Sequence, residues 1–233
     1  MRGAATVLVV IAGLACSGSA AAQDWRNLYD IAVIAQRELD YELAESKLLL
    51  ALELAESAGA APEEIGRIRD RLGLVFFNTG RDERAEDVLR ENLEFKTQLL
   101  GDAHPAVAET LLALSEVSFA KARYEEAGRL LERAVEIRRT GDLPDGPALA
   151  EALVRLGYYH ESRGSLTVAE ESFRQALKAI SGHSKPLQER ADALIGLREV
   201  LRRQGRGEEA DALDASIREV IGRLPPEEGA LPR

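Results

Sequence analysis

The sequence has almost no cysteine and no excess of basic residues, and each shortage excludes a class of protein. Cys16 is the only cysteine among 233 residues, which excludes an internal disulfide and any site built from several thiolates. The formal net charge of −10 argues against a nucleic-acid binder, because phosphate contacts need a basic surface. The same charge argues against a protein held on an anionic membrane surface.

Motifs for catalysis are also missing. The sequence contains no glycine-rich phosphate loop after a strand and no Gly-x-Ser-x-Gly motif. Its three histidines have different settings: His104 precedes Pro105 at an expected helix start, His160 falls on an expected packing face, and His183 lies in a linker. Such positions do not predict a joint metal site. We therefore expect a protein that is not an enzyme and that needs no cofactor or metal.

The longest apolar run lies at the N-terminus and is too short to cross a bilayer. Arg2 precedes the run, residues 4–15 form it, and the alanines at 20–22 fit the small-residue rule for cleavage before Gln23. The alternative, a buried N-terminal helix, would need a polar face that residues 4–15 lack. The pattern predicts a signal peptide over residues 1–22 and an exported protein, either periplasmic or secreted.

Attachment of a lipid anchor at Cys16 stays open as a second interpretation of this segment. Gly13, Leu14 and Ala15 depart from a bacterial lipobox, because Gly stands where a branched residue is usual and Leu where a small one is usual. Ordinary cleavage is therefore the favoured interpretation. Cleavage would remove one charged residue, Arg2, leave a net charge of −11 and leave no cysteine and no transmembrane segment in the mature chain.

An internal repeat dominates the rest of the chain. Its pattern is an alanine followed four residues later by Leu or Phe, and usually by a second alanine three residues further on. The marker alanines of the five copies are spaced by 41, 42, 42 and 41 residues: Ala44, Ala85, Ala127, Ala169 and Ala210. A nearly constant period of this length predicts stacked copies of one structural unit.

Each copy is expected to be a pair of antiparallel helices with the marker alanine on the second helix. Twelve residues upstream lies a position on the first helix that is usually small: Ala32, Gly73, Ser115, Gly157 and Arg198. Gly80, Gly164 and Gly205 fall in the turn, where glycine accepts a backbone conformation that other residues resist. Small residues let the helices approach closely, and one pair cannot bury its apolar face without its neighbours.

We therefore predict an all-α fold, a right-handed α-solenoid of five helix-turn-helix repeats. The domain covers residues 23–223, residues 224–233 form a tail, and the repeats cover about 24–58, 63–99, 105–139, 147–180 and 186–223. The fifth copy is atypical, because Arg198 replaces the small residue and Asp214 replaces the Leu or Phe. A terminal repeat needs such a polar outer face.

The pattern resembles the tetratricopeptide repeat, and more narrowly the kinesin-light-chain type with a period near 42. Residues 100–108, Leu-Gly-Asp-Ala-His-Pro-Ala-Val-Ala, and residues 123–127, Arg-Tyr-Glu-Glu-Ala, carry the resemblance. It covers roughly residues 24–223 and implies a protein-binding scaffold. HEAT-like arrays have a similar period, but they lack small residues at these distances.

The resemblance also implies a concave groove lined by the first helices. In this family five side chains of each first helix point into the groove, six, three and two residues before the small position and one and four residues after it. Aromatic and arginine residues fall at these positions here, in a protein of net negative charge. The predicted partner-binding residues are Tyr29, Arg67, Arg71, Leu74, Phe77, Leu112, Phe119, Arg155 and Tyr158.

Arginine beside aromatic residues suits a peptide that carries an acidic group next to an apolar anchor. The alternative, which stays open, is that these side chains pack against neighbouring repeats. Kinesin-light-chain repeats usually place Asn two residues before the small position, and no Asn occurs there: the residues are Asp30, Arg71, Ala113, Arg155 and Gly196. Kinesin cargo binding and chaperone-tail capture are therefore not expected.

The sequence thus predicts an exported, non-catalytic scaffold that binds a peptide or protein partner through the concave face of a tetratricopeptide array. It does not give the identity of that partner, and no nucleic-acid partner is expected. The alternative function is a structural subunit of an envelope assembly or of a homo-oligomer.

Overall fold

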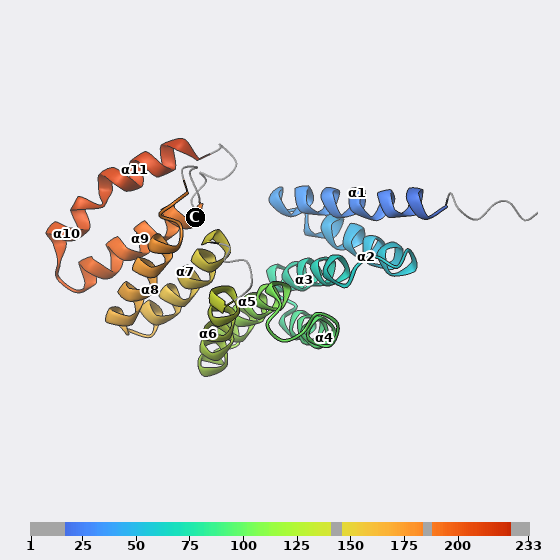
Figure 1. Ribbon diagram of the computed structural model, residues 1–233, viewed down its shortest axis with the longest axis horizontal. Helices are drawn as coiled ribbons and strands as arrows, with labels where there is room; N and C mark the ends of the chain where they lie inside the picture. The colour runs from blue at the N-terminus through green and yellow to red at the C-terminus, as the bar shows by residue number, and fades with distance from the viewer. Residues whose placement is uncertain (1–16, 141–145, 184–187, 225–233) are drawn as a thin grey trace, which may run out of the picture. The chain divides into compact units, whose positions relative to one another are not determined.

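The computed structural model describes residues 17–140, 146–183 and 188–224, and within these ranges every regular element is an α-helix (Figure 1). The helices are α1 (Ser17–Arg37), α2 (Tyr41–Ser57), α3 (Pro62–Asn78), α4 (Asp82–Leu100), α5 (Pro105–Ala120), α6 (Tyr124–Thr140), α7 (Gly146–Ser162), α8 (Leu166–Ala179), α9 (Gln188–Arg203), α10 (Gly207–Ala212) and α11 (Asp214–Arg223). They form successive helical hairpins, of which the first begins at Ser17, before the expected residue 24. The predicted class, an all-α array of helix-turn-helix repeats, is confirmed.

Each hairpin turn has the same backbone conformation. The second residue after the first helix is left-handed in all five copies, with φ of 62° at Leu39, 73° at Gly80, 58° at Ala122, 76° at Gly164 and 79° at Gly205. The next amide then donates back to a carbonyl five residues earlier in the helix, as from Arg81 to Phe76 at 2.9 Å. The sequence predicted the three glycine turns. Leu39 and Ala122 adopt the same conformation without glycine.

The chain divides into two compact units, unit 1 ending at Val88 and unit 2 beginning at Leu89. In unit 1, α1 packs on α2 and α3 packs on α2, around buried residues such as Leu48, Ile68 and Phe76. In unit 2, α5 packs on α6, α7 on α6 and α8, and α9 on α7 and α8. Each unit therefore buries its apolar side chains by stacking one hairpin on the next.

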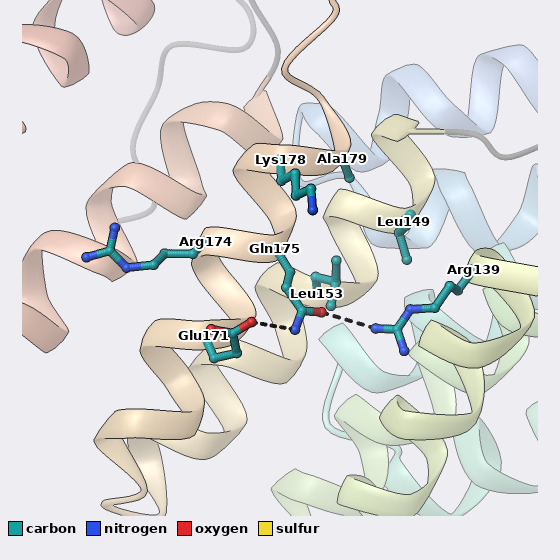
Figure 2. Close-up of a pocket in the computed structure, with 8 residues that line it drawn as sticks. All are labelled: Arg139, Leu149, Leu153, Glu171, Arg174, Gln175, Lys178 and Ala179. Atoms are coloured by element: carbon teal, nitrogen blue, oxygen red, sulfur yellow. Dashed lines mark hydrogen bonds between the residues drawn. The ribbon is translucent and has the colours of Figure 1, made fainter.

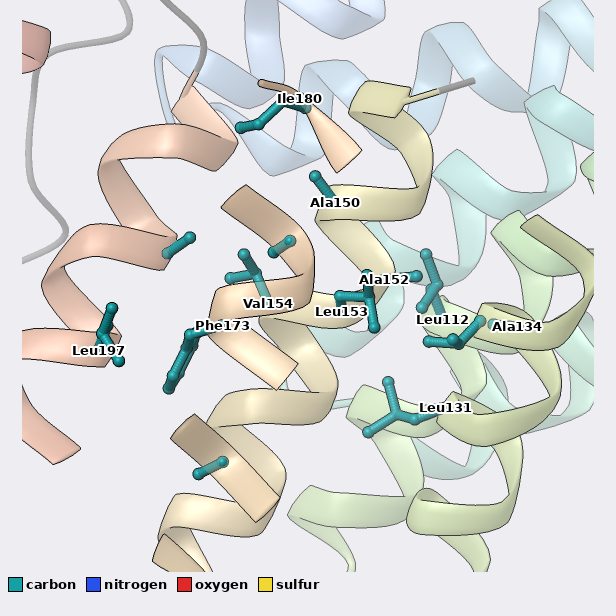
Figure 3. Close-up of a cluster of buried hydrophobic side chains, with 14 of the residues drawn as sticks. Leu112, Leu131, Ala134, Ala150, Ala152, Leu153, Val154, Phe173, Ile180 and Leu197 are labelled. Atoms are coloured by element: carbon teal, nitrogen blue, oxygen red, sulfur yellow. The ribbon is translucent and has the colours of Figure 1, made fainter. Parts of the chain in front are cut away.

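Close approach around Phe173 shows why small residues recur on the first helices of unit 2. Phe173 lies fully buried on α8 within the core cluster of that unit (Figure 3). A Cβ atom added at Gly157 would lie 2.7 Å from its ring, and one added at Gly196 would lie 2.3 Å from it. The ring therefore fills the space that two glycines leave, one in its own hairpin and one in the next.

The fifth hairpin differs from the prediction of one helix over 207–223. Leu213 separates α10 from α11, beside the position where Asp214 replaces the Leu or Phe of other copies. Arg198 Nη1 donates to Asp214 Oδ1 at 3.1 Å, so an ion pair occupies the slot that holds a small and a large apolar residue elsewhere. The last hairpin is consequently polar where the others are apolar.

The predicted ends of the domain fall mostly outside the described residues. Residues 1–16 of the expected signal peptide and residues 225–233 of the expected tail lie outside them. The expected cleavage point before Gln23 lies inside α1, which begins at Ser17. Within the described ranges, none of the helices combines the length and the apolar character that crossing a bilayer requires.

Candidate partner-binding surface

In unit 1, neighbouring first helices bring together residues that lie one repeat apart in the sequence. Arg71 of α3 donates through Nε to Tyr29 Oη at 3.3 Å and through Nη1 to Gln36 Oε1 at 3.4 Å, both on α1. All three residues occupy positions that the sequence predicted for the groove, and we call these positions the first-helix face. Among the residues that the structure describes, the acceptors of the Arg71 guanidinium are therefore neutral, a phenol and an amide.

The other arginines of this face in unit 1 have contrasting environments. Arg26 donates to Glu64 at 2.6 Å and its guanidinium lies 4.3 Å from the centre of the Trp25 ring. Arg67 is exposed, and it forms no ion pair with any residue that the structure describes. Two half-buried apolar side chains, Leu74 and Phe77, complete the predicted set on α3.

Two carboxylates share the first-helix face of unit 1, Asp30 on α1 and Asp70 on α3. Asp30 is exposed and Asp70 is buried. The described contacts of Arg67 and Arg71 include no carboxylate, so within the described residues these two cations are available to a negative group of a partner.

In unit 2 the corresponding arginine is neutralised from both sides. Arg155 of α7 forms ion pairs with Glu116 of α5 and, at 3.1 Å, with Glu151 of its own helix. Burial lowers the pKa of Arg155 from its usual value, and attraction by Asp192 opposes this shift. This arginine is part of an internal network and has no spare charge for a ligand.

Acidic side chains replace arginine at the outermost first-helix position of unit 2. The position six residues before the small residue holds Arg26 and Arg67 in unit 1, and in unit 2 the residues are Glu109, Glu151 and Asp192. Burial raises the pKa of the Glu151 carboxyl, against the attraction of Arg138 and together with the repulsion of Glu189 and Glu109. Burial also raises the pKa of Asp192, to which Gln188 donates at 3.0 Å.

Tyr158 is held at the surface of unit 2 by contacts with two other helices. Its ring meets that of Phe173 on α8 edge to face, with centroids 5.1 Å apart, and its hydroxyl donates to the Asp192 carbonyl on α9 at 3.1 Å. Burial, assisted by the charges of Asp192 and Glu161, raises the pKa of Tyr158 to about 12. The side chain is still 40% exposed, which leaves a fixed aromatic edge for contact.

The two remaining predicted residues differ in access. Phe119 is 37% exposed and lies edge-on to Tyr124, with centroids 5.2 Å apart. Leu112 is 4% exposed and belongs to the core cluster of unit 2 (Figure 3), so it packs between helices and offers little surface to a partner. Its position on α5 was predicted from family geometry, and neighbouring hairpins cover it.

Sequence reasoning did not identify Glu116 as the partner of Arg155. It named both positions as parts of the first-helix face but gave no pairing between them. The only sequence signal was opposite charge on successive first helices. The pairing follows from the register of α5 against α7, which the period alone does not specify.

A separate hollow of about 580 Å³ lies on another side of unit 2 (Figure 2). Side chains of α6, α7 and α8 line it: Arg139, Leu149, Leu153, Glu171, Arg174, Gln175, Lys178 and Ala179. Arg139 donates to Gln175 at 3.1 Å, and Gln175 donates to Glu171 at 2.8 Å. None of the predicted partner-binding residues lines this hollow, and three of its polar side chains contact one another, so it is the weaker candidate.

The histidines have local structural roles. His104 caps α5 by accepting from the amide of Ala106 at 3.2 Å. The ring of His160 packs edge-on to Tyr159, and burial lowers the pKa of its imidazole. In the ranges that the structure describes, His, Cys, Asp and Glu side chains form no group able to hold a metal ion.

Comparison with known protein families shows which family these helical repeats belong to. The profile of the tetratricopeptide repeat matches residues 64–140 and 116–180, which together make up half of the chain. The chain belongs to the tetratricopeptide repeat family. Its repeats are of the kinesin-light-chain-like type that the 42-residue period predicted, and tetratricopeptide repeat proteins are generally non-enzymatic scaffolds that bind proteins or peptides.

Curated relatives share only part of their length with this chain. Tetratricopeptide repeat protein 23 of Homo sapiens is 31% identical over 108 residues, which are 46% of this chain and 24% of that protein. Protein KINESIN LIGHT CHAIN-RELATED 2 of Arabidopsis thaliana is 28% identical over 116 residues, which are 49% of this chain and 18% of that protein. The chain thus spans a quarter or less of these curated relatives.

Solved structures share the fold over nearly the whole chain. BtubC (BKLC) from P. vanneervenii superposes with a TM-score of 0.70 at 18% identity, covering 93% of this chain and 92% of its own. A Rap protein complexed with Competence and Sporulation Factor gives a TM-score of 0.72 at 16% identity, covering 86% of this chain and 54% of its own. At these identities the likeness establishes the fold alone.

Proposed function

We propose that this chain is an exported, non-catalytic scaffold that holds a peptide or protein partner on its first-helix face. The family supports the general role, since tetratricopeptide repeats are interaction scaffolds. The fold is shared with a Rap protein whose structure contains the Competence and Sporulation Factor. The partner itself is inferred from the chemistry of the face.

The partner is a peptide segment with an acidic group beside an apolar side chain. The observation that carries this proposal is the environment of Arg71, whose acceptors among the described residues are the neutral oxygens of Tyr29 and Gln36. Arg67 lies one helical turn before Arg71 and is exposed, and Phe77 is half-buried six residues after Arg71 on α3. A carboxylate of the partner can complete the hydrogen bonding of Arg71, while an apolar residue packs on Phe77.

A displayed library of random peptides tests this proposal without knowledge of the natural partner. The wild-type chain is expected to enrich sequences with Asp or Glu next to a large apolar residue. Enrichment should disappear in Arg67→Ala/Arg71→Ala, and the affinity of the selected peptides should fall as salt concentration rises. The matched control is Arg139→Ala/Arg174→Ala, which removes two arginines from the hollow of Figure 2.

Two outcomes would contradict the peptide proposal. One is enrichment of peptides without acidic residues. The other is equal binding by the Arg67→Ala/Arg71→Ala variant and the wild type. An equal loss in the control variant would show that the total charge of the chain matters and that the first-helix face does not.

Export is the second part of the proposal and has its own test. It rests on Arg2, the apolar residues 4–15 and the alanines at 20–22. Expression with the native N-terminus, followed by intact-mass analysis of the mature protein, should give a chain that begins at Gln23. A retained Met1 would contradict export, and a lipid mass on Cys16 would replace simple cleavage by anchoring.

A further inference from the structure

Six large aliphatic side chains are exposed on the first hairpin of unit 1, among them Leu39 and Leu49, and the other four carry the argument that follows. Ile31 and Ile34 lie on α1 and are 42% and 54% exposed, and Leu43 and Leu50 lie on α2 and are 38% and 43% exposed. We name these four residues the N-terminal end face. None of them belongs to the first-helix face, so the argument that follows does not depend on the proposed function.

The corresponding first-helix positions are buried in later repeats. Ile31 and Ile34 lie one residue before and two residues after the small position. In the second, third and fifth repeats these positions hold side chains that are at most 4% exposed: Leu72 and Val75, Leu114 and Val117, Leu197 and Val200. The later first helices pack on the second helix of the preceding repeat, as α3 does on α2 and α9 on α8. Ile31 and Ile34 are therefore contact residues by position.

The corresponding second-helix positions also contact the preceding repeat. Leu43 and Leu50 lie one residue before and six residues after the marker alanine. In later repeats these positions form polar contacts: Arg84 with Glu45 at 3.8 Å, Glu126 with Arg90 at 2.6 Å, and Gln175 with Arg139 at 3.1 Å. Only the first repeat replaces both positions by leucine. All four residues thus face the side on which later repeats meet their predecessor.

The last repeat ends in a different way. Arg198 pairs with Asp214 at 3.1 Å, and Arg202 pairs with Asp211 at 3.2 Å. Among the described residues, the large exposed hydrophobic side chains do not extend beyond Val168. A terminal repeat that meets water is expected to be polar, as this one is. By that criterion the N-terminal end face is built for contact with another apolar surface.

We propose that the N-terminal end face binds the same face of a second copy of this chain, in a two-fold symmetric dimer. Isologous pairing places apolar on apolar and closes the assembly at two chains. Head-to-tail pairing would instead place the four aliphatic residues on the ion pairs of the last repeat.

Charges beside the face suit a self-complementary contact. Lys47 is four residues after Leu43 and three before Leu50, so it lies between them on the surface of α2. Glu38 directly follows the end of α1, four residues after Ile34, and its amide donates to the Ile34 carbonyl at 3.0 Å. Because the face carries both signs of charge, a two-fold related copy can set Lys47 of one chain against Glu38 of the other.

Light scattering coupled to size-exclusion chromatography tests the dimer on the full chain expressed with its native N-terminus. The wild type is expected to elute with the mass of two chains, and Leu43→Glu/Leu50→Glu with the mass of one. The matched control is Val168→Glu/Gln175→Glu, which introduces glutamate at the same two positions of the fourth repeat and should remain dimeric. Circular dichroism of each variant checks that the helices are retained.

Each outcome decides the proposal. A monomeric wild type at every concentration would overturn it, and this is the result expected if residues of the same chain cover the face. Persistence of the dimer in Leu43→Glu/Leu50→Glu, or its loss in the control, would overturn it too. Should the glutamate variant unfold, Leu43→Ser/Leu50→Ser replaces it, with the same expected loss of the dimer. Peptide binding by the monomeric variant shows separately whether the proposed function holds.

Discussion

The arginines on the first helices have different partners in the two units. In unit 2, Arg155 is enclosed by Glu116 and Glu151, and the last repeat is closed by the Arg198–Asp214 pair. In unit 1, the acceptors of Arg71 among the described residues are neutral, and aliphatic side chains of α1 and α2 are exposed. The same repeat thus gives one unit whose first-helix arginine is paired with carboxylates and one unit whose corresponding arginine is available to another molecule. The comparison makes unit 1 the place to look for partners and unit 2 the place to look for stability.

The largest expected effect is a difference in stability between two phenylalanine variants, one in each unit. Phe173→Ala should lower the free energy of unfolding by about 3–5 kcal/mol, because it empties the space between Gly157 and Gly196. Phe77→Ala in unit 1 should cost less than about 2 kcal/mol, because its side chain is only half-buried. Urea unfolding followed by circular dichroism measures both. Equal decreases in the free energy of unfolding for the two variants would show that the two phenylalanines do not differ in packing.

A matched pair of arginines tests the difference in charge. Arg155→Met should cost about 1–2 kcal/mol, since it leaves two carboxylates unpaired, although the 35% exposure of its side chain limits the loss. Arg71→Met should cost less than about 1 kcal/mol, because its partners are neutral, and should weaken peptide binding instead. Unfolding free energies and peptide affinities of the same two variants provide the readout. A larger loss of stability in Arg71→Met than in Arg155→Met would contradict the comparison.

The hydroxyl of Tyr158 should contribute a smaller amount, of about 1 kcal/mol, through its bond to the Asp192 carbonyl. The pKa of this phenol is raised to about 12, so the folded protein keeps its proton while the unfolded chain loses it. Stability should therefore fall as pH rises from the ordinary tyrosine value towards 12, and Tyr158→Phe should reduce that fall. When the ultraviolet absorbance of this variant is followed against pH, the tyrosine ionisation near pH 12 should be missing. An unchanged titration would exclude the raised pKa.

The smallest expected effect is a pH-dependent gain from Asp192→Asn. Burial raises the pKa of this carboxyl, so its contribution to stability falls as pH rises through the ordinary Asp value to the raised one. The variant should match the wild type at acidic pH, where Asp192 is protonated, and should be slightly more stable at neutral pH. Thermal unfolding across this pH range measures the difference. A neutral-pH loss of stability would mean that the negative charge stabilises unit 2.

Much of the fold could be predicted because the information is local and repeated. The spacing of Ala44, Ala85, Ala127, Ala169 and Ala210 predicted the second, third and fourth hairpins, whose helices the structure contains. The break at Leu213 could not be predicted, since no helix-breaking residue marks it. For the surface, family geometry assigns Tyr29, Gln36 and Arg71 to one face, and Arg71 contacts both of the others. It placed Leu112 on the same face, although neighbouring hairpins bury that residue.

By itself the sequence determined the repeat, the hairpins and the class of protein, because a periodic pattern of small and large residues makes each copy stack on the next in the same way. Only the tertiary structure decided which charges are neutralised and which aliphatic residues stay exposed. These depend on the register between neighbouring helices, which brings Glu116 to Arg155 but, among the described residues, brings neutral acceptors to Arg71. A period fixes the order of the helices, whereas distances between side chains on different helices set their electrostatics.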